Sequence, residues 1–365
     1  MKLRDRLKCT PTCGRDGTSC RKPKLTLFFK IKVLGPRADH EGSCCEFMSQ
    51  TDAIVRIPKR RSHQRVKNAL LYRKALLYRN GLLYLLMRCG LFAVERLPIR
   101  GFLRLIGCLS PYIFRREARL AQEHLRLTLP HLDPVKITRR MFVHFSESIW
   151  ELSRLHQSVP ELDAAARRVL DEALAEGKGA IFVTGHVGNW EMLGQAIAAA
   201  GYPMSTIAKP FYDPRVTRWL HEWRARHGLK IIWRDQNSGK AILRALRSNN
   251  LMAFLIDQDT KTAGDYVPFF GRPAFTPTTP AALALRTGAP LIFSWHHRRG
   301  KRHQITIERV VFARSGDQQR DILALTALLT ARLESVIRTV PEQWVWMHRR
   351  WRRSNPEESP LIAST

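Results

Sequence analysis

The segment 179–194, GAIFVTGHVGNWEMLG, constrains the fold more than any other part of this chain. Residues 180–183 form a short apolar run with two β-branched side chains between glycine-containing turns, which predicts a buried strand. Asn189 is a favourable cap for a helix over residues 190–200. The segment therefore predicts a buried strand, a tight turn and the start of a helix.

His186 lies in the predicted turn, and Glu191 follows it in the first turn of the predicted helix. Residues five apart diverge on a continuous helix, so these two meet only if the chain turns between them, as Gly185 and Gly188 allow. A carboxylate that holds one imidazole nitrogen fixes the tautomer and leaves the other nitrogen free to accept a proton. A hydroxyl deprotonated there would be able to attack a carbonyl. The alternative is a structural histidine in a strand–helix turn.

Strands and helices alternate along the rest of the chain. Further strands are predicted at 204–208, 230–233, 251–256, 291–296 and 304–312, and further helices at 115–130, 134–155, 214–227, 238–248, 277–287 and 317–338. Strands separated by helices indicate an α/β layered domain with a central, mainly parallel sheet flanked by helices. Functional groups in such sheets gather at the carboxyl ends of strands, which is where His186 falls.

Basic residues greatly exceed acidic ones: 61 Lys and Arg against 31 Asp and Glu give a formal net charge of +30. This excess predicts an anionic partner, which is nucleic acid, an anionic membrane surface or an acidic protein. Many basic residues stand beside apolar and aromatic ones, as in LLYRKALLYRN and WMHRRWRR, and this pattern suits a membrane interface. It also suits single-stranded nucleic acid, so a non-enzymatic nucleic-acid-binding protein is a rival interpretation.

Composition divides the chain into four parts. Residues 1–60 are rich in Cys, Arg, Lys, Gly and Pro, and we expect them to be disordered or a mis-annotated N-terminal extension. Residues 67–109 contain an apolar run broken by Arg88 and bracketed by basic residues, which predicts a membrane-associating helical segment. A single span, an interfacial helix and a long buried helix are all open for it. Residues 110–353 are the expected catalytic domain and residues 354–365 a flexible tail.

Several kinds of chemistry lack their motifs. The sequence has no P-loop, no GxGxxG and no GxSxG elbow, so neither a nucleotide site nor a serine nucleophile is indicated. Five of the seven cysteines fall in the first 45 residues, which leaves the body without a disulfide framework. Asp257 and Asp259 are spaced to share a metal ion, but no His or Glu at ligand spacing joins them. We therefore expect neither a metal nor a cofactor.

Three blocks of sequence resemble one family. His186 with Glu191 is similar to the HX4(D/E) motif of membrane glycerolipid and lipid A acyltransferases. The sequence HVGNWE resembles that of the branch of this family that adds secondary acyl chains to lipid A, and that of its lysophospholipid and mannoside acyltransferase relatives. The run DQDTKTAGDYVPFFGRPAFTPTTPAALALRTGAP resembles the family's second block and PEQWVWMHRRWRR its C-terminus. The resemblance covers residues 67–353, although His124 stands where the family usually has asparagine.

The resemblance implies a direct acyl transfer. His186 would act as general base on an acceptor hydroxyl, Glu191 would orient it and stabilise the imidazolium, and the hydroxyl would attack an acyl thioester without an acyl-enzyme. The implied donor is acyl carrier protein, or coenzyme A, and an acidic carrier suits the basic surface. The implied acceptor is an anionic lipid A precursor, with a lysophospholipid, glycolipid or aminolipid as the alternative. The expected location is the cytoplasmic face of a bacterial inner membrane, with no nucleic acid as partner.

Four more residues of the predicted site come from the motif blocks. Asp257, Gln258 and Asp259 directly follow the apolar run 251–256, and the resemblance assigns them to the wall of the active site. Asn189 belongs to the first block and is expected to contact substrate. A loop start with solvated carboxylates is the plain alternative for the two acids.

Three cations are candidate phosphate ligands. Lys209 ends a predicted strand, and Arg234 and Arg244 are candidates of the same kind, because arginine is the better bidentate ligand. Ordinary exposed side chains are the alternative for each of them. The rings and cations of residues 341–353 suit a lipid headgroup surface or a solvated helix end, and His348 has no acid partner in sequence that would make it catalytic.

Overall fold

The computed structural model describes residues 81–353, except residues 156–158, 227, 236 and 301. The chain divides at residue 62, and every described residue belongs to the unit of residues 63–365. The predicted N-terminal extension, the first part of the membrane segment and the flexible tail lie outside the described residues. The remaining elements are described here.

The described helices, apart from a helix over residues 81–96, are α2 (Arg100–Ile113), α3 (Arg115–Thr128), α4 (Pro134–Ser153), α5 (Ala164–Ala175), α6 (Trp190–Ala199), α7 (Pro214–Arg226), α8 (Ser238–Arg247), α9 (Thr279–Thr287), α10 (Gln318–Thr339) and the short 3₁₀ helix η1 (Pro341–Gln343). The described strands are β1 (Ala180–Thr184), β2 (Met204–Ala208), β3 (Lys230–Trp233), β4 (Leu251–Leu255), β5 (Gly264–Phe269), β6 (Arg272–Pro277), β7 (Leu291–Arg299) and β8 (Arg302–Val310).

Six of these strands form one sheet in the order β3-β2-β4-β1-β7-β8. All neighbouring pairs run parallel except β7 and β8, which are antiparallel. Every residue of β1 is buried, as expected for a central strand covered on both faces. The predicted α/β fold with a mainly parallel sheet is confirmed, and the strand and helix predictions listed above each correspond to an observed element.

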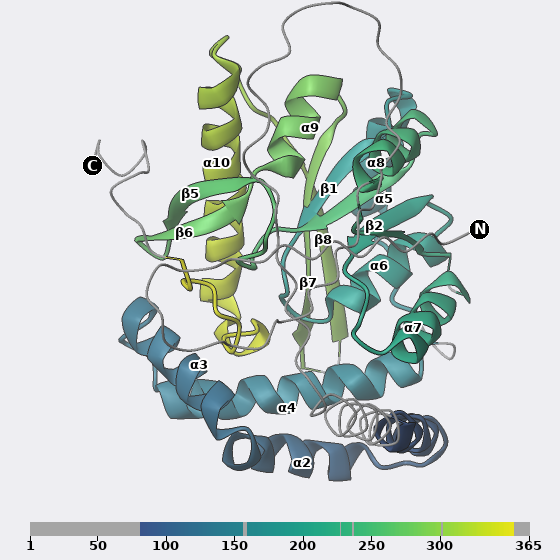
Figure 1. Ribbon diagram of the computed structural model, residues 1–365, viewed down its shortest axis with the longest axis vertical. Coiled ribbons are helices and arrows are strands. Elements are labelled where there is room, and N and C mark those ends of the chain that lie inside the picture. The colour runs from purple at the N-terminus through teal and green to yellow at the C-terminus, as the bar shows by residue number, and fades with distance from the viewer. Residues whose placement is uncertain (1–80, 156–158, 227, 236, 301, 354–365) are drawn as a thin grey trace, which may run out of the picture. The chain divides into compact units, whose positions relative to one another are not determined.

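The sheet has two apolar faces, each covered by its own helices. Residues that alternate along β1 divide between two clusters: Ile181 and Val183 pack on one side, and Ala180 and Phe182 on the other. The first cluster contains residues of α9 and α10 together with the β5–β6 hairpin, and the second contains residues of α5 and α6. Figure 1 shows α2, α3 and α4 together at one end of the sheet.

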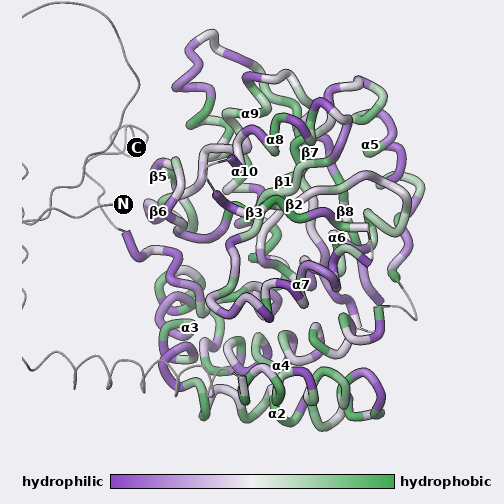
Figure 2. Tube along the Cα trace, turned by 45° about the vertical axis from the view of Figure 1, so that its right-hand side comes forward, coloured by the Kyte–Doolittle hydropathy of each residue, from purple (hydrophilic) through white to green (hydrophobic). Residues whose placement is uncertain are grey.

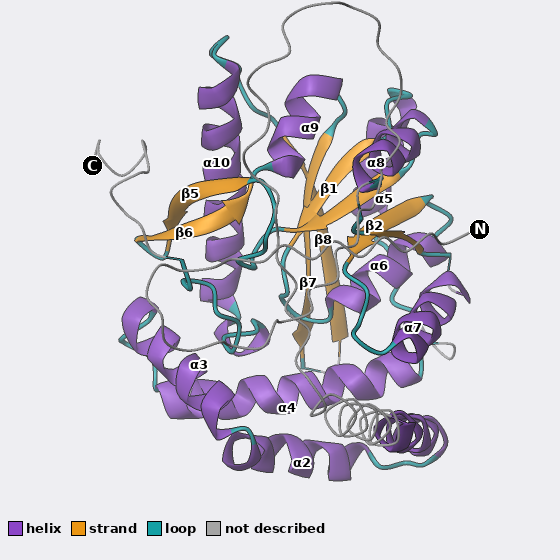
Figure 3. Ribbon diagram, viewed as in Figure 1, coloured by secondary structure: helices purple, strands orange, loops and turns teal. Residues whose placement is uncertain are grey.

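Two features were not predicted. Helix α5 is capped by Asp163 and buries Ala166, Leu170 and Ala173, which stand at helical spacing, so the sequence does carry a signal for it. The β5–β6 hairpin (Figure 3) contains Pro268 opposite Pro273, and prolines argue against strands in sequence. A two-stranded ribbon tolerates them because it is all edge. Phe270 and Gly271 make its turn with positive φ angles of 53° and 68°, as a tight hairpin requires.

The predicted membrane segment is divided in the structure. The helix over residues 81–96 ends before Pro98, and α2 starts at Arg100. Within the described part of the chain, no helix has both the length and the apolar content that crossing a bilayer requires.

Candidate active site

The loop after β1 carries His186 at the carboxyl end of the sheet. The ring Nδ1 of His186 lies 2.7 Å from Oδ1 of Asp257, and the backbone N–H of His186 donates to Oδ2 of Asp257 at 2.7 Å. Asp257 follows β4, the parallel neighbour of β1, so the two loops leave the sheet side by side. The ring of His186 keeps 16% of its surface exposed, while the Asp257 side chain is fully buried.

Asp257 is held as a carboxylate. Its Oδ2 accepts a second hydrogen bond, 2.8 Å long, from the indole N–H of Trp344. Burial by itself would raise the pKa of Asp257, but the adjacent His186 and the hydrogen bonds from His186 and Trp344 outweigh it and hold that pKa well below its usual value. An ionised Asp257 can only accept, so Nδ1 of His186 carries the proton and Nε2 presents its lone pair.

Glu191 does not contact the imidazole in the way the sequence predicted. Both of its carboxylate oxygens accept from the guanidinium of Arg224 on α7, one at 2.9 Å from Nε. The predicted Glu191–His186 pair is not formed in this structure, because the carboxylate next to the imidazole comes from the loop after the neighbouring strand. Glu191 instead joins the start of α6 to α7.

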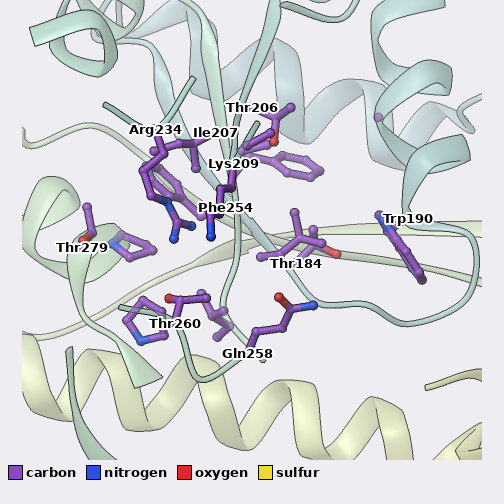
Figure 4. Close-up of a pocket in the computed structure, with 18 of the residues that line it drawn as sticks. Thr184, Trp190, Thr206, Ile207, Lys209, Arg234, Phe254, Gln258, Thr260 and Thr279 are labelled. Carbon is purple, nitrogen blue, oxygen red and sulfur yellow. The ribbon is translucent and has the colours of Figure 1, made fainter. Parts of the chain in front are cut away.

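A cavity of about 640 Å³ opens beside His186. His186 and Glu191 both line it, with Trp190 packed edge-to-face against the imidazole at 4.8 Å between ring centroids. Figure 4 shows Trp190 and Gln258 among the lining residues, with Lys209 and Arg234 extending towards the cavity from the ends of β2 and β3. The imidazole therefore faces a space that is large enough for a substrate chain.

The inner wall of this cavity is apolar and reaches between the sheet and its helices. It consists of side chains that belong to both core clusters, including Phe182, Leu193, Met204, Leu229, Ile242, Ala253 and Phe254. The lining combines these apolar side chains with the cations Lys209, Arg224 and Arg234. Such a cavity suits a ligand with an anionic head and a long apolar chain.

The other predicted residues divide between the cavity and its supports. Lys209, Arg234 and Gln258 line the cavity, whereas Arg244 is exposed on α8 and is not part of the lining. Asp259 is turned away, with its Oδ1 3.1 Å from Nε of Arg353.

Asn189 is buried and supports the loop that carries His186. Its Oδ1 accepts from the N–H of Met192 at 3.2 Å and caps α6, and its Nδ2 donates to Glu151 of α4 at 3.1 Å. Neighbouring Gly188 has a φ of 60°, and a Cβ there would lie 1.9 Å from the carbonyl oxygen of His296. The loop therefore needs glycine at this position, since no side chain fits.

The C-terminal segment, residues 341–353, is part of the site. Trp344 and Trp346 are fully buried, and Arg350 is 1% exposed. Trp344 also forms an isolated antiparallel bridge with Val187 in the catalytic loop. Neither sequence interpretation of this segment, headgroup surface or solvated helix end, describes these buried side chains.

His348 lies next to His186, although the sequence offered no acid partner for it. The ring centroids of the two histidines are 5.1 Å apart. Burial and the positive charge that His186 can carry lower the pKa of His348 to about 4, so its ring is neutral near pH 7. Gln258 Nε2 lies 3.2 Å from Nε2 of His186, and it lies 3.1 Å from Nδ1 and 3.2 Å from Nε2 of His348. The amide of Gln258 thus joins the two rings.

The pairing of His186 with Asp257 has a signal in the sequence that our reading did not use. Asp257 stands immediately after an apolar strand, as His186 follows another, and the carboxyl ends of adjacent parallel strands meet at one edge. The contacts of Trp344 and His348 have no such signal, because η1 and the turns after it direct the last residues back to the loop.

No set of three or more His, Cys, Asp or Glu side chains is arranged to hold a metal ion among the described residues. The expectation that the protein works without a metal or cofactor stays a prediction.

Residues 72–353 match the family model for the bacterial lipid A biosynthesis acyltransferases. The chain is 24% identical over 290 residues to the lipid A biosynthesis lauroyltransferase of Escherichia coli K12, covering 74% of this chain and 91% of that protein. It is 27% identical over 187 residues to a phosphatidylinositol mannoside acyltransferase of Mycobacterium tuberculosis, covering 50% of this chain and 57% of that protein. A lipid A biosynthesis acyltransferase of Haemophilus influenzae is 24% identical over 250 residues, covering 64% of this chain and 75% of that protein.

Proposed function

Because the chain belongs to the bacterial lipid A biosynthesis acyltransferase family, we propose that it moves a fatty acyl chain from an acyl thioester to a hydroxyl of a lipid A precursor. The observation that carries this proposal is the pairing of His186 with the buried carboxylate of Asp257 at the mouth of the 640 Å³ cavity. Glu191, the predicted partner, serves instead as part of the cavity wall through its pair with Arg224.

The proposed mechanism follows from the tautomer. Nδ1 of His186 is protonated towards Asp257, so Nε2 accepts the proton of the acceptor hydroxyl. The oxygen attacks the thioester carbonyl, and collapse of the tetrahedral intermediate breaks the C–S bond. The thiolate then takes the proton from Nε2. Asp257 stabilises the imidazolium that exists between these steps, and no side chain forms a covalent intermediate.

The cavity suits the donor. Its apolar interior would hold the acyl chain, and Lys209 and Arg234 would pair with phosphate groups of the donor's carrier or of the acceptor. Acyl carrier protein is the proposed donor, since an acidic carrier would be attracted by a chain of formal net charge +30. Coenzyme A is the alternative thioester.

The acceptor has a second candidate. Relatives that are named lipid A acyltransferases support a phosphorylated glucosamine lipid. The mycobacterial relatives are named phosphatidylinositol mannoside acyltransferases and support a glycolipid acceptor, although the alignment spans only 57% of the relative's length. Lysophospholipid and aminolipid acceptors use the same chemistry. Nucleic acid, the predicted rival partner, has no support from the family.

The exposed apolar side chains of the N-terminal helices favour binding to a membrane surface. Figure 2 shows hydrophobic residues along α2. The exposed apolar side chains of α2 and the helix before it, named here the apolar face, are Leu82, Leu83, Leu85, Leu86, Phe92, Phe102, Leu105, Ile106, Leu109, Tyr112 and Ile113. Exposed Arg88, Arg96 and Arg104 stand among them. Such a face would enter the headgroup region of an anionic bilayer, and we propose the cytoplasmic face of a bacterial inner membrane as its location.

Flotation with vesicles tests this location. The wild-type chain should float with vesicles that contain anionic lipid, and the double variant Leu105→Asp, Leu109→Asp should stay at the bottom while retaining its fold by circular dichroism. Equal flotation of the two proteins would contradict a role for the apolar face.

The experiment that tests the activity uses purified membranes, labelled acyl carrier thioester and a panel of lipid acceptors. The wild-type chain should transfer label to a phosphorylated glucosamine lipid in preference to lysophospholipids. His186→Ala should lose transfer, whereas His131→Ala, which alters an exposed histidine in the loop before α4, should not. Transfer by His186→Ala at the wild-type rate would reject the mechanism.

A further inference from the structure

The orientation of the Gln258 amide follows from the tautomer of His186. Nε2 of His186 has only a lone pair to offer, because Nδ1 holds its proton towards Asp257. The atom of Gln258 that lies 3.2 Å from it must therefore be the donor NH₂ group. The same nitrogen lies 3.1 Å from Nδ1 and 3.2 Å from Nε2 of neutral His348, so its second hydrogen points to that ring. One amide nitrogen thus donates to both rings.

The two ends of this arrangement differ in their access to substrate. His186 and Gln258 line the cavity, whereas His348 is not part of the lining. His348 holds one amide hydrogen from the protein side, and the other hydrogen points to the lone pair that the acceptor hydroxyl has to reach. In the absence of substrate, the hydrogen bond from Gln258 therefore occupies the position at Nε2 of His186 that the acceptor hydroxyl needs.

Binding of the acceptor changes the partners of this amide. When the acceptor hydroxyl donates to Nε2 of His186, the N–H of Gln258 loses its acceptor, and a partly buried donor without a partner is unfavourable. The new acceptors within its reach are the oxygen atoms of the reacting groups. The bond to His348 keeps the amide in place while its other hydrogen changes partner.

We propose that Gln258, held by His348, is a catalytic residue that donates a hydrogen bond to the oxyanion formed from the thioester carbonyl. This inference rests on the proposed acyl transfer. The hydroxyl proton passes to Nε2 of His186 as the new C–O bond forms, and the carbonyl electron pair moves onto oxygen, where the Gln258 N–H stabilises it. The intermediate then expels the thiolate, which takes the proton back from Nε2. His348 is a positioning residue that acts through Gln258.

The test compares Gln258→Leu, which keeps the size and removes the donor, with Gln195→Leu. Gln195 is a fully buried residue of α6 outside the cavity lining, and its amide has no partner among the described residues. Gln258→Leu should lower kcat about 10²–10³-fold while KM for the thioester changes less than about threefold. Gln195→Leu should change neither. His348→Phe, which keeps a ring without an acceptor, should lower kcat by an intermediate factor.

Ligand binding gives a readout that does not depend on turnover. Gln258→Leu should bind an alkylphosphonate mimic of the tetrahedral intermediate at least about tenfold more weakly than the wild type, and an alkyl thioether without a carbonyl equally well. A kcat within threefold of the wild type, or equal weakening for both ligands, would overturn the assignment. If wild type and His186→Ala do not differ in transfer, the acyl-transfer mechanism fails, and that result is distinct from an inactive His186→Ala beside an unaffected Gln258→Leu.

Discussion

The replacement of Trp344 by phenylalanine tests how the carboxylate of Asp257 is held. The indole N–H of Trp344 donates to Asp257 at 2.8 Å, and phenylalanine keeps most of the buried ring while removing this donor. Trp346 provides a matched control, because it is equally buried and its indole N–H donates at 2.7 Å to the neutral carbonyl of Pro341. A hydrogen bond to a charged group contributes about 1.5–3 kcal/mol and one between neutral groups about 0.5–1.5 kcal/mol.

Trp344→Phe should therefore destabilise the protein by about 1 kcal/mol more than Trp346→Phe does. If a comparable amount is lost in the transition state, kcat falls about fivefold in Trp344→Phe, since 1.36 kcal/mol corresponds to a factor of ten. Trp346→Phe should stay near the wild-type rate. Initial rates of acyl transfer and thermal melting of both variants measure these quantities.

The pH dependence of folding stability provides an independent test of the same hydrogen bond. The folded protein depresses the pKa of Asp257, so the ionised carboxylate stabilises the fold above the unfolded value of about 4, and this contribution is lost as the pH falls through the folded value. Removing the Trp344 donor raises the pKa of Asp257 towards its ordinary value, so acid unfolding of Trp344→Phe should begin at a higher pH. Identical rates and identical acid unfolding in the two tryptophan variants would refute the reasoning.

Three other replacements have expected outcomes. Gly188→Ala places a Cβ against the His296 carbonyl at 1.9 Å, so soluble expression and melting temperature should fall, and a melting temperature equal to wild type would show that the loop adapts. Arg224→Gln removes the partner of Glu191 and should cost about 1.5–3 kcal/mol, measured by thermal melting; an unchanged melting temperature would mean that this pair is dispensable. Gly194→Val fills the cavity beside Leu229 and should shift the preferred donor to shorter acyl chains, measured with a series of thioesters; an unchanged preference would place the chain elsewhere.

Local patterns in the sequence were enough for the sheet and its helices. The apolar run before His186 and the similar run before Asp257 each specified a buried strand, and the alternation with helices specified the parallel order. The hairpin was missed because Pro268 and Pro273 oppose strand formation in a central sheet but not in a ribbon. Helix α5 was not predicted, although Ala166, Leu170 and Ala173 stand at helical spacing after the capping Asp163.

The candidate site was predicted less completely, because its decisive contacts join distant parts of the chain. His186 could be identified from its place after a strand, but its carboxylate partner stands 71 residues away and not five. Trp344 and His348 come from the C-terminus, whose basic composition suggested a surface. Composition reports the average environment of a segment, and it does not identify which side chains turn inwards.

Replacement of Asp257 by asparagine tests the central claim most directly. Two N–H groups, from His186 and Trp344, point at Oδ2, so the amide oxygen has to occupy that position and the NH₂ group then faces Nδ1 of His186. Nδ1 must accept, the ring proton moves to Nε2, and the base can no longer take the hydroxyl proton.

The deciding measurement is the single-turnover rate of acyl transfer by Asp257→Asn beside Glu191→Gln. The account predicts a loss of about 10³–10⁴-fold for Asp257→Asn and less than about tenfold for Glu191→Gln. A larger loss in Glu191→Gln than in Asp257→Asn would contradict it, because Glu191 would then be the carboxylate on which the imidazole depends.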